Sequence, residues 1–186
     1  FYWGQQKLDL FEQMEQTIKK LEGESGVIWK GLRVRRLIQM GSQTQDAGER
    51  NAFLAEAKTI LEMLPPLVVN RPQTPVLLGR IALQERRFPD AARHFEAAWI
   101  QGERTVVSAT ELIFALQSAG DAAKVESYLE QMQNFLRVSP QLFDLALGAK
   151  SQVSFADLDT SAEIAQSWVQ SIADADSYVR LARILQ

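Results

Sequence analysis

We predict an all-α fold from three features of the sequence. Apolar residues recur three and four positions apart along most of the 186 residues, and this period indicates about ten amphipathic helices. No segment alternates apolar and polar residues over more than a few positions, so no β-strand is expected. Residues 75–98 contain two amphipathic segments separated by a short turn, which is the pattern of a helical hairpin.

The N-terminal region, residues 1–71, is predicted to form irregular helices. The first helix, over residues 5–22, ends at Gly23, and its apolar face consists of Leu8, Phe11, Ile18 and Leu21. A second helix is expected over residues 27–40, where Gly31 would permit a neighbouring helix to approach closely.

A polar loop at residues 41–48 is expected to precede a third helix that ends at Pro65. Residues 65–72 then form either a joint between sub-domains or a short extended link between hairpins.

The clearest hairpin spans residues 72–105. Thr74 is the predicted N-cap of its first helix, because a threonine side chain can accept a hydrogen bond from the first turn. Pro89 is expected to open the second helix and Gly102 to end it. Small residues stand where the two helices would touch, at Gly79, Ala91 and Ala98.

A known family places its characteristic residues at the same spacing as Leu78, Gly79, Ala91, Phe95 and Ala98. The segment therefore resembles this family, the tetratricopeptide repeat, whose unit is a helical hairpin of about 34 residues. The helix-B spacing also fits three residues of the third predicted helix, Ala57, Leu61 and Leu64. The resemblance implies a single right-handed solenoid of stacked antiparallel hairpins.

Residues 106–139 are predicted to be a second, degenerate repeat. Gly120 and Asp121 form the pair that the family prefers between its two helices, and Ile113 replaces the family glycine. The rest of the chain is predicted as a repeat-like hairpin over residues 140–174 and the first helix of a truncated repeat over residues 175–186. That uncovered end would allow end-to-end self-association.

Composition excludes several classes of protein. With a net charge of −3 and an isoelectric point near 5.3, the chain is not a general nucleic-acid binder, and it has no cysteine for disulfides or thiolate sites. No apolar run approaches the roughly 18 residues of a membrane span. The chain starts without Met and stops inside a predicted helix, so we expect a piece of a longer protein, with the cytoplasm as the default location.

No catalytic motif is recognised. The sequence lacks a phosphate-binding loop, a zinc-protease motif and a nucleophile elbow, and its one histidine, His94, is interpreted as a solvated side chain. The acidic pairs Asp157 with Asp159 and Asp174 with Asp176 precede predicted helices, where they offset the helix dipole. We therefore expect no enzyme activity, no cofactor and no metal.

The resemblance implies that a partner would bind on the concave face, which the first helix of each hairpin lines. The positions carried over to this sequence are Gln73, Val76, Arg80, Leu83 and Gln84, and Val107, Thr110, Phe114, Gln117 and Ser118. The expected partner-binding residues among them are Arg80, Gln84, Thr110, Phe114 and Gln117. Arg80 and Phe114 are the expected anchors, since arginine and aromatic residues contribute disproportionately to binding. The alternative is that Phe114 packs inside the stack.

A second candidate surface is the basic stretch of Lys30, Arg33 and Arg36. It is either a patch for an anionic partner or a solvated helix face whose charges pair with acidic neighbours. From these features we predict a protein-interaction scaffold that binds a protein or peptide. The alternative is a structural spacer within a large protein.

Overall fold

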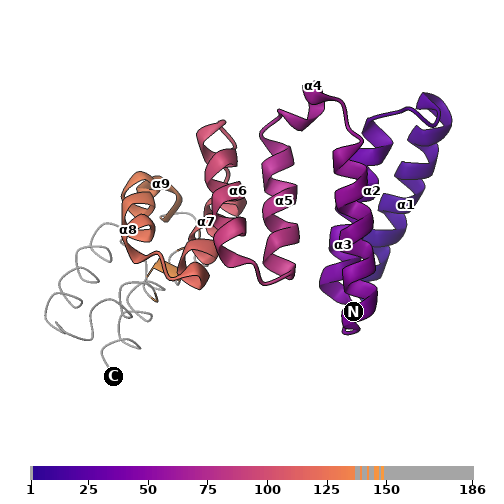
Figure 1. Ribbon diagram of the computed structural model, residues 1–186. Coiled ribbons are helices and arrows are strands. Elements are labelled where there is room, and N and C mark those ends of the chain that lie inside the picture. Colours follow the sequence, from indigo (N-terminus) through magenta and orange to yellow (C-terminus); the bar gives the residue numbers. More distant parts are fainter. Residues whose placement is uncertain (1, 137–138, 140–141, 143–144, 147, 149–186) are drawn as a thin grey trace, which may run out of the picture. The chain divides into compact units, whose positions relative to one another are not determined.

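A computed structural model describes residues 2–136, 139, 142, 145, 146 and 148. All regular structure in these residues is α-helical, as the sequence predicts (Figure 1). The predicted hairpin of residues 140–174 lies almost wholly outside the described residues, and the predicted helix of residues 175–186 lies entirely outside them. The chain divides into two compact units, residues 1–104 and 105–186.

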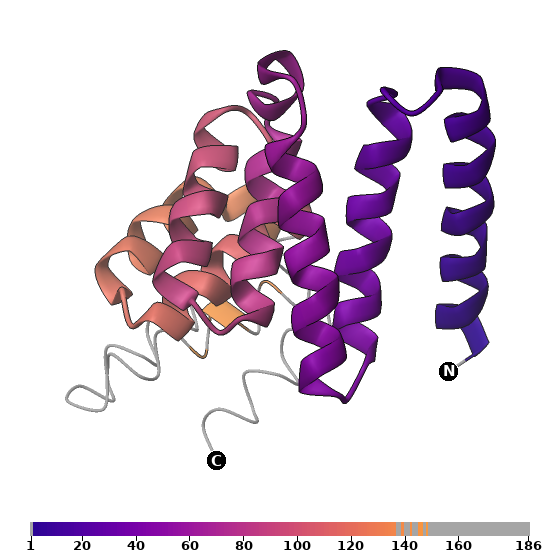
Figure 2. The ribbon, with the colours of Figure 1, turned by 45° about the vertical axis from the view of Figure 1, so that its right-hand side comes forward.

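The first unit is a series of antiparallel helices. They are α1 (Tyr2–Glu22), α2 (Ile28–Gln43), α3 (Ala47–Glu62), the single turn α4 (Pro66–Val69), α5 (Gln73–Gln84) and α6 (Phe88–Ile100). Helix α2 packs between α1 and α3, and α5 packs against α6 and also contacts α2 and α3 (Figures 1 and 2). One apolar core joins α2, α3 and α5, with side chains that include Val34, Leu54 and Ile81.

The prediction of a polar loop at residues 41–48 is wrong, because most of these residues are helical. Helix α2 continues to Gln43, and Asp46 begins α3 by accepting a hydrogen bond from the backbone N–H of Glu49 at 2.9 Å. The hydroxyl of Thr44 also donates to the Glu49 carboxylate at 2.7 Å. These contacts satisfy polar groups at the start of α3, so the connection is a tight turn rather than a long loop.

The close approach expected at Gly31 occurs instead at Gly41. A Cβ atom at Gly31 would meet nothing within 4 Å. At Gly41 it would lie 2.7 Å from Oε1 of Gln84 and 3.4 Å from Cδ2 of Leu54. Gly41 is therefore the glycine of α2 that the packing requires.

Helices α5 and α6 form the hairpin predicted for residues 72–105. Gly79 faces the ring of Phe95, since a Cβ atom there would lie only 2.8 Å from two carbons of that ring. The predicted N-cap at Thr74 is wrong: α5 begins at Gln73, and the buried Thr74 hydroxyl donates to the carbonyl of Val68 at 3.1 Å. The threonine thus fixes α4 to α5 instead of capping α5.

The second unit contains α7 (Val106–Ala119), α8 (Ala122–Gln131) and the short α9 (Gln133–Leu136) within its described residues. Thr105 and Ser108 cap α7 reciprocally, each side chain bonding to the backbone of the other. Gly120 adopts φ +77° after α7, and Asp121 caps α8. The turn predicted at Gly120 and Asp121 is confirmed.

Buried positions recur at a constant spacing, equal to the family's repeat length, in or just after the second helix of three successive hairpins. The corresponding triplets are Ala57, Ala91 and Val125; Leu61, Phe95 and Leu129; and Leu64, Ala98 and Met132. Helices α5 and α7, the first helices of their hairpins, also have buried residues that correspond at this spacing. Examples are Thr74 with Ser108 and Ala82 with Leu116. The same face of each hairpin is therefore buried although most residue types differ.

Candidate partner-binding surface

The five predicted partner-binding residues lie on two helices of different units. Arg80 and Gln84 belong to α5, whereas Thr110, Phe114 and Gln117 belong to α7. Each helix is therefore a separate candidate surface.

On α5, both predicted residues already serve the fold. The Nε2 atom of Gln84 donates to the backbone carbonyl of Ile38 in α2 at 2.8 Å, which ties these two helices together. Arg80 is half-buried, and this residue already takes part in an interaction. Val76, another position carried over from the family groove, is buried. Little of the predicted α5 surface is left for a partner.

On α7, an apolar row remains exposed. Val107 is 57% exposed and Phe114 is 44% exposed, and a separation of seven residues, about two turns, places them on one face of the helix. Thr110 lies between them, half-buried, with its hydroxyl donating to the carbonyl of Val106 at 2.8 Å. That bond leaves the methyl group of Thr110 as its contribution to the row.

Gln117 extends the same face of α7 but is used internally. Its Nε2 atom donates to the carbonyl of Leu145 at 2.6 Å, within the second unit. A partner that took this amide would have to break that bond. Val107, Thr110 and Phe114, which we call the α7 row, are thus the residues of the predicted groove best placed for a partner.

The basic stretch on α2 is largely neutralised by carboxylates. Nε of Arg33 donates to Glu56 at 2.7 Å and its guanidinium also reaches Glu15 at 3.1 Å, while Nε of Arg36 donates to Glu15 at 2.9 Å. Burial would lower the pKa of Arg33, but its hydrogen bonds to Glu56 and Glu15 outweigh burial and raise it. The Lys30 ammonium lies 5.6 Å from the centre of the Trp29 ring.

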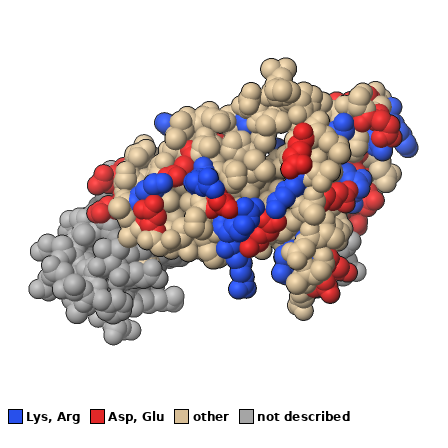
Figure 3. Space-filling view, in the orientation of Figure 1, with Lys and Arg blue, Asp and Glu red and all other residues tan. Residues whose placement is uncertain are grey.

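Through these pairs Arg33 links α2 to both α1 and α3, and Arg36 links α2 to α1. Glu15, which receives both guanidinium groups, is only 4% exposed. Lys, Arg, Asp and Glu side chains are interspersed over the face shown in Figure 3, where neither sign forms a continuous field. This arrangement agrees with the interpretation of the stretch as a helix face paired with acidic neighbours.

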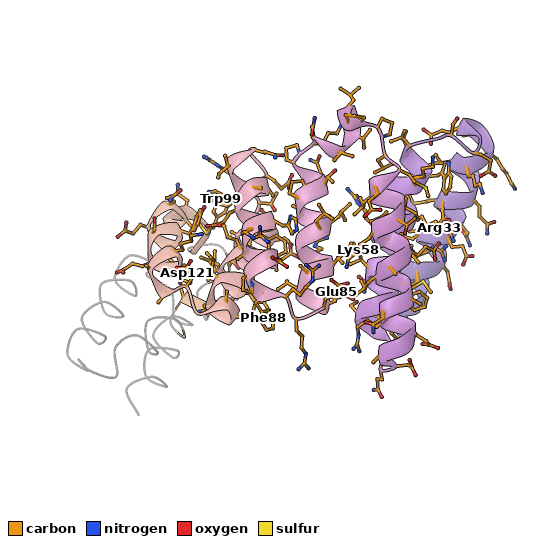
Figure 4. The ribbon with its side chains drawn as sticks, in the orientation of Figure 1. Arg33, Lys58, Glu85, Phe88, Trp99 and Asp121 are labelled. Atoms are coloured by element: carbon orange, nitrogen blue, oxygen red, sulfur yellow. The ribbon has the colours of Figure 1, made fainter. Side chains whose placement is uncertain are left out.

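A second group of ion pairs surrounds the turn between α5 and α6. Nζ of Lys58 in α3 lies 2.5 Å from a carboxylate oxygen of Glu85 (Figure 4). Arg87 bridges Glu85 and Asp90 at 2.6 Å each. Burial would raise the pKa of Glu85, but the hydrogen bonds from Lys58 and Arg87 outweigh it and lower that pKa. The group fastens α3 to the α5–α6 hairpin.

The remaining candidate groups are His94 and the side chains that could bind a metal ion. His94 is half-buried, and its pKa is lowered by burial first and then by the charge of Arg93, which favours the neutral form of the imidazole. Within the described part of the chain, no cluster of three or more His, Asp or Glu side chains has a geometry that would hold a metal ion. Among the same residues, no helix is both long and apolar enough to cross a bilayer.

Sequence reasoning missed an exposed apolar row on α1. Leu10 is 56% exposed, Met14 42% and Leu21 82%. Leu21 was predicted to share the packing face with Leu8, Phe11 and Ile18, but only those three are partly buried. The signal was present in the sequence, because Leu10, Met14 and Leu21 are four and seven residues apart and form a second apolar arc beside the first.

No protein-family model, curated protein or solved structure matches this chain. The relation to tetratricopeptide repeats therefore stays a prediction. It rests on the residue pattern, to which the recurrence of buried positions at the family's repeat length now adds.

Proposed function

We propose that this chain is a protein-interaction scaffold of the tetratricopeptide-repeat type, and that it binds a protein or peptide partner through the α7 row. In this proposal the hairpins stack into a right-handed solenoid. The observation that carries the proposal is the exposure of Val107 and Phe114 on one face of α7. These two are the only large apolar side chains that are exposed in the described part of the second unit.

Two features support the stacked arrangement. The buried faces of the hairpins recur with the period of the family, at positions such as Leu61, Phe95 and Leu129. Within the first unit, α5 contacts both helices of the preceding hairpin, α2 and α3. A hairpin cannot cover both of its apolar faces alone, so contact with both helices of the previous hairpin is what a solenoid needs.

The α7 row indicates the chemistry of the partner. A phenylalanine side chain in contact with an apolar group of a partner excludes water from a large area, and such anchors often dominate binding. Helix α7 has one charged residue, Glu111, so the helix itself offers no positive charge for a carboxylate or phosphate. The partner is expected to present apolar side chains about 10 Å apart, the length of two helical turns, on a helix or an extended segment.

The proposal is tested by selecting binders from a random peptide library displayed on phage. Enriched peptides are then measured by fluorescence anisotropy against the native chain and against a Phe114→Ser variant. We expect affinity to fall at least about tenfold, because a buried aromatic anchor contributes more than about 1.4 kcal/mol. Val107→Ser is expected to weaken binding less, since its side chain is smaller.

The matched control is Ile100→Ser, which removes another exposed apolar side chain, 74% exposed on α6. Unchanged far-UV circular dichroism would show that both variants keep their helices. Peptides that bind the Phe114→Ser variant as tightly as the native chain would contradict the site. Equal losses in both variants would indicate unspecific apolar binding and would also contradict it.

The alternative function, a spacer that positions other domains, is favoured by a different observation. Two of the five predicted partner-binding residues, Gln84 and Gln117, use their amides to hold neighbouring backbone carbonyls. A spacer requires such internal bonds and no exposed anchor. Failure to enrich any peptide would leave this function in place of the scaffold.

A further inference from the structure

We propose that the exposed apolar row on α1 is the antiparallel contact of a homodimer, in which α1 of one copy packs against α1 of a second copy. The row consists of Leu10, Met14 and Leu21. The proposal concerns the first unit alone and is independent of the function assigned to α7.

The row lies beside the contact that α1 already makes. The side of α1 that meets α2 contains the buried Glu15 and the half-buried Phe11 and Ile18. At 3.6 residues per turn, Leu10, Met14 and Leu21 form a narrow arc next to this side, and Thr17 falls on the same arc. In the first unit α1 contacts α2 and stands at one end of the series of helices (Figures 1 and 2).

The ends of the row indicate a second copy as the occupant. Asp9 precedes Leu10, and Lys20 precedes Leu21. Asp9 and Lys20 are therefore eleven residues apart, as are Leu10 and Leu21, and this separation is about three helical turns. Asp9 and Lys20 therefore lie on the same edge of the row, at opposite ends, and both are exposed. The helix is negative at one end of this edge and positive at the other.

Only an antiparallel arrangement of two copies matches this charge distribution. It places Leu10 against Leu21 of the second copy, and it brings Asp9 of each chain beside Lys20 of the other. A parallel two-fold arrangement would place this edge of the two copies on opposite sides of the contact, where Asp9 and Lys20 could not pair across it. Met14 would then lie opposite Thr17 of the second copy, so the centre of the contact has one large and one small side chain in each layer.

Disulfide trapping tests the arrangement directly, since the chain has no cysteine of its own. Two single variants, Leu10→Cys and Leu21→Cys, are mixed and oxidised under mild conditions. The antiparallel dimer predicts a disulfide between the two different variants. It predicts little cross-linking of Leu10→Cys with itself, because those Cα atoms would be about 16 Å apart along the helices and a disulfide needs less than about 7 Å.

Met63→Cys is the control for random collision, as Met63 is 66% exposed on a different helix end. Cross-linking of Leu10→Cys with Leu21→Cys that does not exceed this control would overturn the proposal. Preferential disulfides between identical variants would also overturn it, because they indicate a parallel contact.

Sedimentation analysis of the full 186-residue chain measures the strength of the contact. We expect Leu10→Glu to raise the dimer dissociation constant at least about tenfold and Met63→Glu to leave it unchanged. Lys20→Glu should weaken the dimer, and the double variant Asp9→Lys with Lys20→Glu should restore it. A native chain that stays monomeric at all concentrations would overturn the proposal and would leave the row to a different protein.

Discussion

The α5–α6 hairpin and the α7–α8 hairpin bury side chains at corresponding positions, one repeat length apart. They differ in which of their two helices carries the larger side chain where the helices meet. In α5, Gly79 leaves room for the ring of Phe95 on α6, whose carbons would lie 2.8 Å from a Cβ atom. At the corresponding positions of the second hairpin stand Ile113, which is fully buried, and Leu129, which is 2% exposed. A larger residue on the first helix accompanies a smaller one on the second.

The turns of the two hairpins share a backbone conformation but differ in the residues that adopt it. Arg86 and Gly120 occupy equivalent positions of the two turns, and both adopt a left-handed backbone, with φ +57° and +77°. Glycine adopts this conformation without strain, whereas arginine does not. Asp121 caps α8 with its side chain, while Arg87, at the equivalent position, makes no such bond to α6. The comparison shows that the hairpin depends on where residues are buried and where the turn falls, more than on which residues are used.

The largest expected effect comes from alanine at the two corresponding helix positions. Ile113→Ala removes buried methyl groups and is expected to lower the free energy of unfolding by about 2–5 kcal/mol. Gly79→Ala adds a methyl group against the Phe95 ring and is expected to cost about 1–3 kcal/mol, although alanine is the better helix former. Urea denaturation followed by far-UV circular dichroism measures both changes.

The control for Gly79→Ala is a second substitution that imitates the other hairpin. Phe95→Leu in the same chain should recover part of the loss, because leucine leaves space for the new methyl group. Additive losses in the double variant would show that Gly79 and Phe95 do not share the strain. A Gly79→Ala variant as stable as the native chain would contradict the close approach itself.

A smaller effect is expected from exchanging the turn residues. Arg86→Gly relieves a left-handed non-glycine residue and should raise the free energy of unfolding by up to about 1 kcal/mol, since the glycine adds entropy to the unfolded chain and offsets part of the gain. Gly120→Ala introduces that strain and should lower stability by about 1–2 kcal/mol. Thermal denaturation of the two variants in parallel checks the opposite signs. Equal signs would show that the two turns are not equivalent.

The smallest expected effect concerns Glu85, whose ion pairs with Lys58 and Arg87 lie at the turn between α5 and α6. The lowered pKa of Glu85 means that the folded state favours its charged form, so its contribution to stability is present above the ordinary carboxyl pKa of 4.5 and disappears as the pH falls through the lowered value. Glu85→Gln should therefore reduce stability by at most about 1 kcal/mol at pH 7, after screening by solvent, and by less near about pH 3.

Urea midpoints at the two pH values measure this difference. Glu62→Gln is the matched control, because Glu62 is an exposed carboxylate at the end of α3. The idea fails if Glu85→Gln and Glu62→Gln show the same dependence on pH.

Sequence reasoning reached much of the fold but less of the candidate surface. The hairpin of α5 and α6, the turn at Gly120 and the α7 face that contains Phe114 all follow from local pattern and from the spacing of small residues. The predicted roles of Gln84 and Gln117 could not be judged from sequence, because their hydrogen-bond acceptors are carbonyls 46 and 28 residues away. The prediction of a loop at residues 41–48 was wrong because it overlooked the cap at Asp46, although this cap is a local signal.

By itself, the sequence determined that the described chain is helical and which arcs of each helix are apolar, because the helical period and the caps are local properties. The tertiary structure alone decided which of these arcs are covered. Gly41, and not Gly31, meets a neighbouring side chain, and Leu21 is exposed although it continues an apolar pattern with Ile18. The physical reason is that an apolar arc wider than one neighbouring helix is covered only as far as that neighbour reaches, and the position of the neighbour is set by residues far away in the chain.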